Sequence, residues 1–322
     1  MPSRRKVLTS LVAASVTAGC GDSSPPTSTG KGLDQVTYLT GFGVSPRETY
    51  PHVGLSQGYF TEAGIDLTIR PGQPSDANLG TLAAGQAQFA SVDFVSAVRG
   101  TKKFTDYRAV MAVQSSTLLS IITLDGRGIT KPADLAGRKL GAAPAAASHT
   151  LFPTYARLAG LDPAAVTWID SPADQLPSLL VSNRVDGIGS YAIDIPTIRT
   201  AAQGKTPVAL PYGTYIKDLY GTVVVATRSV VDGDADLVRR FTGAMAKTVR
   251  FAVHNPAEAG RLVQAALPTV KGTVVAEVMG LMAPYVTEPT LDRGRVERSI
   301  GVLQKAGLAA PGLTPDQVVA FA

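Results

Sequence analysis

Residues 54–67 of this chain read Gly54-Leu55-Ser56-Gln57-Gly58-Tyr59-Phe60-Thr61-Glu62-Ala63-Gly64-Ile65-Asp66-Leu67. A helix is predicted to begin at Pro51, because proline suits a first helical turn where its missing N–H costs nothing, and to end near Gly58. Residues 65–69 alternate between apolar and polar side chains with a period of two, which predicts a strand. The segment therefore contains a junction between a helix and a strand.

Strand-like and helix-like segments alternate on both sides of this junction. The expected strands cover residues 35–41, 65–69, 88–92, 107–114, 118–124, 139–142, 166–169, 185–189, 208–210 and 220–226. The expected helices cover residues 51–58, 75–85, 94–99, 148–159, 173–182, 195–203, 237–255, 256–267, 271–281 and 292–307. This alternation implies an α/β fold of parallel βαβ units with right-handed crossovers, with the helical C-terminal third packed on one of the sheets. A chain of 322 residues also exceeds what one small core usually organises, which suggests two domains.

Composition narrows the classes of function. Cys20 is the only cysteine, so no disulfide can form within the chain and the fold must rest on a full-sized core. The net charge of +5 falls to roughly +2 once the three basic residues of the first nineteen are set aside, which is too small a charge for a nucleic-acid partner. The three histidines, His52, His149 and His254, lack the spacing of a metal site. We expect no cofactor and no metal.

The first twenty residues have the pattern of an export signal. Ser3-Arg4-Arg5-Lys6 precedes an apolar run over residues 7–16, and small residues lead up to Cys20. The twin arginines and the following Val7-Leu8 resemble a twin-arginine signal, and export by the Sec route is the alternative. Residues 20–34 are polar and rich in serine, threonine and proline, which predicts a flexible tether.

Cys20 itself resembles the lipidated cysteine of a bacterial lipobox. The resemblance implies that residues 1–19 are removed, that the Cys20 thiol carries a diacylglycerol and that Cys20 becomes the mature N-terminus. The protein would then be held on the outer face of the plasma membrane. The alternative is an ordinary secretory peptide in which the position of the cysteine is a coincidence.

The helix–strand junction at residues 54–67 resembles a signature of the solute-binding proteins of ABC importers. Three further segments resemble that family in the order in which it has them: residues 82–89, 129–141 and 182–187. The match extends over residues 35–270 and is nearest to the branch that binds thiamine-precursor pyrimidines, sulfonates, taurine and nitrate. Related enzymes that build the pyrimidine carry a cysteine-rich iron motif, and a chain whose only cysteine is Cys20 cannot carry that chemistry.

The resemblance implies a two-lobed periplasmic-binding-protein fold of type II, with the ligand held between two βαβ lobes. The first lobe would take residues 35–117 and 225–322, and the second would take residues 118–224. Two hinge strands, at residues 115–117 and 220–226, would absorb the closing motion.

The implied function is non-catalytic. A monomeric receptor would capture a small polar nutrient, such as a thiamine-precursor pyrimidine or a similar planar or zwitterionic compound, and deliver it to an ABC permease and its ATPase. The alternatives are a binder of alkanesulfonate, taurine or nitrate, a sensory or adhesive lipoprotein without a transporter, and an enzyme on the same scaffold.

The candidate ligand-binding residues follow from the rule that loops beyond the carboxyl ends of parallel strands face the cleft of an open α/β sheet. Together with the second hinge, the rule selects Phe42, Arg47, Tyr50, Ser75, Asp93, Ser148, His149, Tyr191, Asp194 and Tyr212.

Each candidate has an expected role and a structural alternative. Arg47 can bind an anionic head group through its two-pronged guanidinium, whereas Asp93 and Asp194 can accept hydrogen bonds from an amine. Aromatic rings such as Tyr191 can stack on a planar ligand, and helix starts such as Ser148 can donate N–H groups. The alternatives are a solvated loop arginine, helix caps and packing between the lobes.

Replacing the lipidation cysteine tests the anchor. We expect Cys20→Ser to release the protein from the cell membrane into the medium, because no acyl chain would then hold it there. Membrane and medium fractions probed with an antibody measure the effect. Membrane retention of the variant equal to that of the wild type would contradict a lipid anchor at Cys20.

Overall fold

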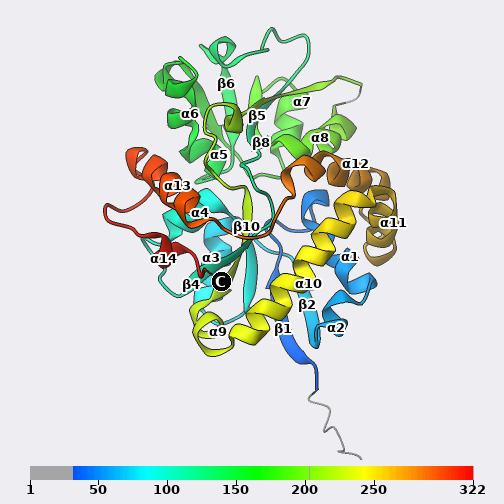
Figure 1. Ribbon diagram of the computed structural model, residues 1–322. Helices are drawn as coiled ribbons and strands as arrows, with labels where there is room; N and C mark the ends of the chain where they lie inside the picture. The colour runs from blue at the N-terminus through cyan, green and yellow to red at the C-terminus, as the bar shows by residue number, and fades with distance from the viewer. Residues whose placement is uncertain (1–31, 203, 322) are drawn as a thin grey trace, which may run out of the picture. The chain divides into compact units, whose positions relative to one another are not determined.

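The computed structural model describes residues 32–202 and 204–321, and two five-stranded sheets organise this part of the chain (Figure 1). The expected signal segment and Cys20 lie outside the described residues. The first sheet has the order β2-β1-β3-β10-β4 and consists of β1 (Asp34–Leu39), β2 (Ile65–Arg70), β3 (Phe89–Asp93), β4 (Tyr107–Ala112) and β10 (Thr222–Thr227). The second sheet has the order β7-β6-β8-β5-β9 and consists of β5 (Leu119–Leu124), β6 (Lys139–Ala142), β7 (Thr167–Asp170), β8 (Gly187–Tyr191) and β9 (Pro207–Pro211).

Both sheets are mixed rather than fully parallel. Strand β1 runs parallel to β2 and β3, and β6 runs parallel to β7 and β8, as the alternation of strands and helices predicted. Strand β10 is antiparallel to β3 and β4, and β5 is antiparallel to β8 and β9. The reason is the path of the chain, which leaves the first sheet along β4, enters the second along β5, leaves it along β9 and returns along β10. A strand that brings the chain back beside the strand by which it left must run in the opposite direction.

The helices agree with the sequence pattern except at four places. Four helices follow the first three strands along the chain: α1 (Tyr50–Ser56) and α2 (Tyr59–Glu62) come after β1, α3 (Ser75–Ala83) after β2 and α4 (Phe94–Gly100) after β3. In the second group, the helix expected over residues 148–159 is divided into α5 (Ala147–Thr150) and α6 (Phe152–Leu158), because Pro153 has no N–H with which to continue the helical ladder. The helices α7 (Leu176–Val181) and α8 (Ile195–Ala201) follow. The sequence did not predict the short helices α2, α9 (Arg228–Gly233) and α14 (Pro315–Val318).

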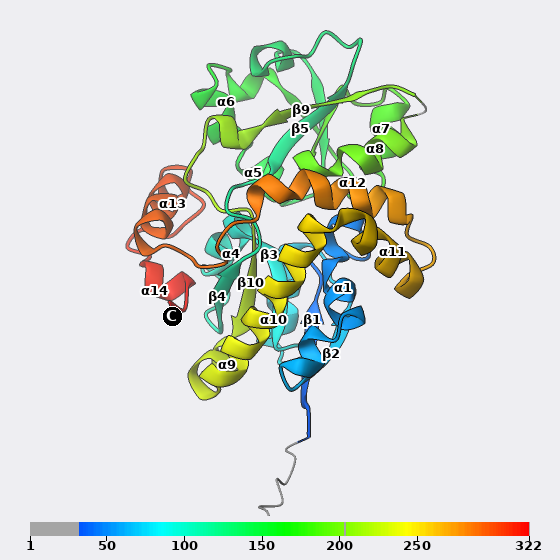
Figure 2. The same ribbon diagram turned by 45° about the vertical axis from the view of Figure 1, so that its right-hand side comes forward.

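The C-terminal helices cover the first sheet and reach the second. Phe241 of α10 (Ala235–His254) stacks on Phe89 of β3 with ring centroids 3.8 Å apart, so this long helix closes the core of the first sheet. Helices α11 (Pro256–Ala266), α12 (Gly272–Met282) and α13 (Arg293–Lys305) follow. Helix α12 packs against α8 and lies between α8 and α10 (Figure 2). Among the described residues, no helix is long and apolar enough to cross a membrane.

The two chain crossings between the sheets are hydrogen-bonded to each other. Thr117 N–H donates to Leu219 O at 2.9 Å, and Val113 N–H donates to Thr222 O at 2.9 Å. Ser115 N–H donates to Tyr285 O at 2.7 Å, which ties the outgoing crossing to the segment after α12. These are the segments that the sequence analysis assigned to the hinges.

Asp93 is the last residue of β3, and only one oxygen of its buried carboxyl group has a hydrogen-bond partner. It is 3% exposed, and its Oδ1 accepts the N–H of Val95 at 2.9 Å, which caps α4. Its Oδ2 has no hydrogen-bond partner in the described part of the chain. Burial, which disfavours the charged form, raises the pKa of Asp93 from 3.8 to about 7.

This raised pKa predicts a pH dependence of stability. Between pH 3.8 and about 7 the folded protein keeps a proton on Asp93 that the unfolded chain has released, so a rise in pH favours unfolding in this window. We expect Asp93→Asn to gain stability relative to the wild type as the pH rises through this window, by at most about 1.4 kcal/mol per pH unit.

Urea unfolding at pH 4, 5.5 and 7.5 measures the effect. The comparison with the wild type isolates Asp93, because the buried Glu48, whose pKa burial also raises, is present in both proteins. A difference in unfolding free energy that stays constant with pH would contradict a buried, protonated Asp93.

Candidate functional site

A cavity of about 350 Å³ lies where the carboxyl ends of strands from both sheets meet. From the first sheet it is lined by residues after β1, β2 and β3: Gly41, Phe42, Ser45, Pro46, Arg47, Pro74, Ser75, Asp76, Ser96 and Arg99. From the second sheet it is lined by residues around β6, β7, β8 and α8: Ala143, Pro144, Ala145, Ala146, Ala147, Ser148, Ala173, Asp174, Leu176, Pro177, Ile188, Gly189, Ser190, Tyr191, Asp194, Thr197 and Ile198. This is the position that the rule on open α/β sheets predicts.

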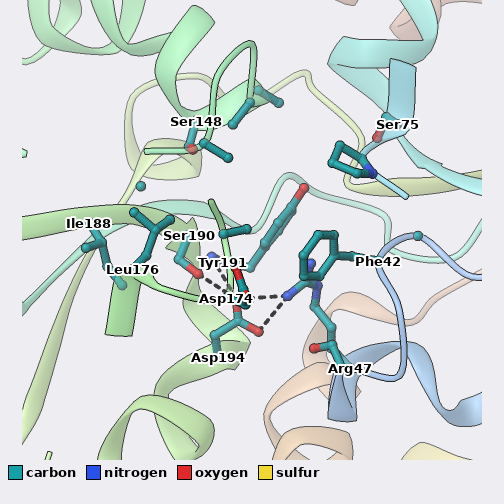
Figure 3. Close-up of a pocket in the computed structure, with 18 of the residues that line it drawn as sticks. Phe42, Arg47, Ser75, Ser148, Asp174, Leu176, Ile188, Ser190, Tyr191 and Asp194 are labelled. Atoms are coloured by element: carbon teal, nitrogen blue, oxygen red, sulfur yellow. Dashed lines mark hydrogen bonds and ion pairs between the residues drawn. The ribbon is translucent and has the colours of Figure 1, made fainter. Parts of the chain in front are cut away.

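An ion pair between Arg47 and Asp194 joins the two sides of this cavity (Figure 3). Arg47 lies in the turn Pro46–Glu48 after β1, and Asp194 lies in the turn Ala192–Asp194 after β8. Arg47 Nη1 donates to both carboxylate oxygens of Asp194, at 3.0 and 3.1 Å. The guanidinium also lies over the ring of Tyr191, 4.4 Å from its centroid, in a cation–π contact.

The remaining acceptor capacity of Asp194 is used locally. Its Oδ2 accepts the hydroxyl of Ser190 at 2.6 Å and the backbone N–H of Tyr191 at 3.3 Å. Burial by itself lowers the pKa of Arg47, but the nearby carboxylates of Asp194 and Glu48 raise it above its ordinary value. The pair is therefore held by hydrogen bonds as well as by charge.

Glu48 supports Arg47 from the side of the first sheet. The carboxylate is 5% exposed, accepts the N–H of Gly41 at 2.9 Å and lies 3.4 Å from Arg47 Nε. Burial raises the pKa of Glu48, and the charge of Arg47 opposes this rise. A Cβ at Gly41 would come within 2.7 Å of Glu48 Oε1, so glycine is required here for the carboxylate to reach the backbone.

The second arginine of the cavity is paired as well. Arg99 Nη2 lies 2.7 Å from Asp76 Oδ1, and Arg99 Nη1 donates to Thr150 Oγ1 at 3.1 Å. Asp174 is exposed at the rim and makes no ion pair or hydrogen bond with the described residues. Along the lining, both arginines thus have an aspartate partner, and the carboxylate of Asp174 has no cationic partner among the described residues.

Apolar side chains and a close approach of two segments shape the rest of the wall. Leu176 and Ile188 face the cavity (Figure 3), together with several prolines and alanines. Ser148 lies against Gly189 of β8. A Cβ at Gly189 would lie 2.5 Å from Ser148 Oγ, so glycine lets α5 approach the strand. The first turn of α3, which contains Ser75, faces the same space.

The structure brings six of the ten predicted ligand-binding residues together at the cavity: Phe42, Arg47, Ser75, Ser148, Tyr191 and Asp194. Four predicted residues lie elsewhere. Tyr50 is buried in the core with its hydroxyl 3.3 Å from that of Tyr38, and Asp93 caps α4. His149 stacks on Trp168, and Tyr212 is buried, where it donates to Ser148 O at 2.6 Å.

Helix caps were among the structural alternatives for the candidates, but neither Ser75 nor Asp76 caps α3. The helix begins after Pro74 without a side-chain cap, and Ser75 Oγ instead accepts the N–H of Asp93 at 3.3 Å. The reason is that the end of β3 lies nearby, so the Ser75 hydroxyl accepts a hydrogen bond from the N–H of Asp93 and not from its own helix.

The sequence analysis also missed several lining residues: Ser96, Arg99, Asp174, Leu176, Ile188 and Ser190. Applied to the strand predicted over residues 166–169, the rule on carboxyl ends would have selected residues 170–172, and Asp174 lies just beyond them because α7 begins later than predicted, at Leu176. In the described part of the chain, no group of three or more histidine, cysteine, aspartate or glutamate side chains could hold a metal ion.

Comparisons with known proteins agree with this architecture. The family described as "NMT1/THI5 like" matches residues 48–259. The formylaminopyrimidine-binding protein of Halalkalibacterium halodurans is 24% identical over 260 residues, which are 79% of this chain and 76% of that protein.

Solved structures show the same fold. The alkanesulfonate-binding protein SsuA from Xanthomonas axonopodis pv. citri, bound to MOPS, has a TM-score of 0.72 at 12% identity over 90% of this chain and 98% of that chain. The desulfurization enzyme DszB has a TM-score of 0.61 at 18% identity over 89% of this chain and 96% of that chain. The predicted α/β fold of periplasmic binding proteins is confirmed, and it also carries an enzyme. Because the family model covers more than half of the sequence, this chain belongs to the NMT1/THI5-like family.

Proposed function

We propose that this protein is the solute-binding component of an ABC importer and that it captures a small planar, polar nutrient of the aminopyrimidine class. The cavity between the two sheets would hold the ligand, and a permease with its ATPase would receive it. The family, the fold of the alkanesulfonate-binding relative and the formylaminopyrimidine-binding relative support this proposal.

One observation carries the choice of ligand class. The cavity contains a carboxylate, Asp194, beside an aromatic ring, Tyr191, and a guanidinium, that of Arg47, now contacts both; the second arginine, Arg99, is paired with Asp76. A ring that carries amino groups can stack on an aromatic face and donate to a carboxylate. A free anion would find no unpaired guanidinium along this wall, while the exposed Asp174 at the rim would repel it.

A second candidate is an anionic ligand of the sulfonate class. It is favoured by the first turns of α3 and α5 at the cavity, since N–H groups at a helix start attract negative charge. The similarity of the fold to an alkanesulfonate-binding protein also supports it. The third candidate, an enzyme, rests on the likeness to DszB, and we expect no turnover of bound compounds.

The remaining parts of the proposal concern motion and location. The two lobes, residues 35–117 with 225–322 and residues 118–224, would close on the ligand about the hydrogen-bonded crossings near Thr117 and Leu219. A lipid anchor at Cys20 would keep the monomeric receptor outside the cell and beside its permease.

Thermal-shift measurements on the purified mature domain test the proposal. Formylaminopyrimidine at about 100 times its Kd should stabilise the native state by about 2.7 kcal/mol, whereas taurine and other alkanesulfonates should have no effect. Tyr191→Ala should weaken this binding about ten-fold or more, because the variant loses the stacking face.

The matched control is Tyr59→Ala, which removes a tyrosine from α2 outside the cavity. It should keep the full ligand-induced shift. A shift produced by sulfonates and not by the pyrimidine would favour the anionic candidate, and turnover of either compound would contradict a pure binding function.

A further inference from the structure

The Arg47 guanidinium occupies both features of the cavity that a planar ligand would use. It lies over the face of Tyr191 at 4.4 Å and donates to both oxygens of Asp194 (Figure 3). The pair is well shielded from water, with side-chain exposures of 15% for Arg47 and 10% for Asp194. The stacking face and the carboxylate are thus filled by a side chain of the protein itself.

A guanidinium resembles the proposed ligand in shape and in hydrogen bonding. It is planar, stacks on aromatic faces and carries N–H donors along its edge. An aminopyrimidine is a planar ring with N–H groups in its plane, and an amidine is a planar group with N–H donors along its edge. A ligand of this kind and Arg47 would therefore make the same contacts with Tyr191 and Asp194, and only one of them can do so at a time.

We propose that Arg47 is an internal occupant of the ligand site and that a planar ligand with N–H donors displaces it from Tyr191 and Asp194. This inference rests on the proposed function and adds to it a residue that sets affinity and selectivity. An unsubstituted alkanesulfonate, such as ethanesulfonate, has no N–H donor and cannot replace the guanidinium at Asp194, so the displacement step selects against such anions.

Glu48 makes this displacement feasible. It lies 3.4 Å from Arg47 Nε, it belongs to the same turn and it is itself buried. When the guanidinium leaves Asp194, it keeps a carboxylate partner on its own side of the cavity. Arg47 is then not left without a counter-charge, and the N–H donors of the ligand replace the hydrogen bonds that Asp194 loses, which reduces the cost of breaking the ion pair.

Internal occupancy lowers the apparent affinity for the ligand. Only molecules in which Arg47 has moved away can bind, so the apparent Kd is the intrinsic Kd divided by the fraction of such molecules. Removing the guanidinium should therefore tighten binding. A conventional role for Arg47, in which it contacts the ligand directly, predicts the opposite sign.

Isothermal titration of Arg47→Met tests the proposal with formylaminopyrimidine, benzamidine and ethanesulfonate as probes. We expect the variant to bind the first two about 5- to 30-fold more tightly than the wild type, the factor expected for an interaction of this size, and ethanesulfonate no more tightly. Arg47→Lys should shift in the same direction by a smaller factor, because lysine keeps the charge beside Glu48 but has no plane to stack. It decides the test if Arg47→Met does not fold.

Arg199→Met is the matched control. Arg199 of α8 pairs with Glu277 of α12 at 2.8 Å, joins the same two parts of the molecule and does not line the cavity. Its affinity for the probes should equal that of the wild type. An equal gain in this control would assign the effect to general loosening of the two parts and would overturn the proposal.

The affinity of the wild type for formylaminopyrimidine tests the proposed function. The ratio of the Kd of the variant to the Kd of the wild type tests this inference. If the wild type binds none of the probes and Arg47→Met binds benzamidine, internal occupancy is supported although the pyrimidine ligand is not. Unchanged or weakened binding of formylaminopyrimidine and benzamidine in both Arg47 variants would overturn the inference, even where the wild type binds the pyrimidine. Tighter binding of ethanesulfonate by Arg47→Met would overturn the proposed selectivity.

Discussion

The charge network of Glu48, Arg47 and Asp194 is the interaction on which the site depends. It places an arginine and two carboxyl groups in a largely dry environment, where removing one member leaves another without its partner. It also spans the cavity, because Glu48 and Arg47 follow β1 of the first sheet and Asp194 follows β8 of the second. The geometry of the site and the association of its two walls therefore have the same physical origin.

The connectivity of the chain explains why these groups meet. Two crossings link the sheets, and the strands at the crossings run antiparallel to their neighbours, so the carboxyl ends of β1, β6 and β8 face a common space. Helix α12 adds a third link, since it packs against the turn that carries Arg47 and against α8. A ligand that enters this space contacts loops from both sheets at once, which is what a receptor that closes on its ligand requires.

Small residues create the space that the charged groups leave open. Gly41 lets Glu48 reach the backbone, and Gly189 lets Ser148 approach β8. The alanines around Ala145 have short side chains that fill little of the cavity on the side of the second sheet. Ala145 itself has a φ of 58°, a left-handed conformation that non-glycine residues seldom adopt and that often marks a functional loop. The combination of small residues, one aromatic face and paired charges suits a flat and polar ligand better than a bulky or strongly anionic one.

Local patterns in the sequence were enough to determine the α/β class, nearly every strand and helix, and the family. Periodicity, glycine and proline act over a few residues, as at the junction of residues 54–67, so a single sequence carries this information. The rule on strand ends also predicted that Arg47, Tyr191 and Asp194 would face one cleft. Only the tertiary structure decided that Arg47 binds Asp194, because the two residues are 147 positions apart and their distance depends on the packing of both sheets. For the same reason the burial of Tyr50 and Tyr212, and the direction of β5 and β10, could not be derived from the sequence.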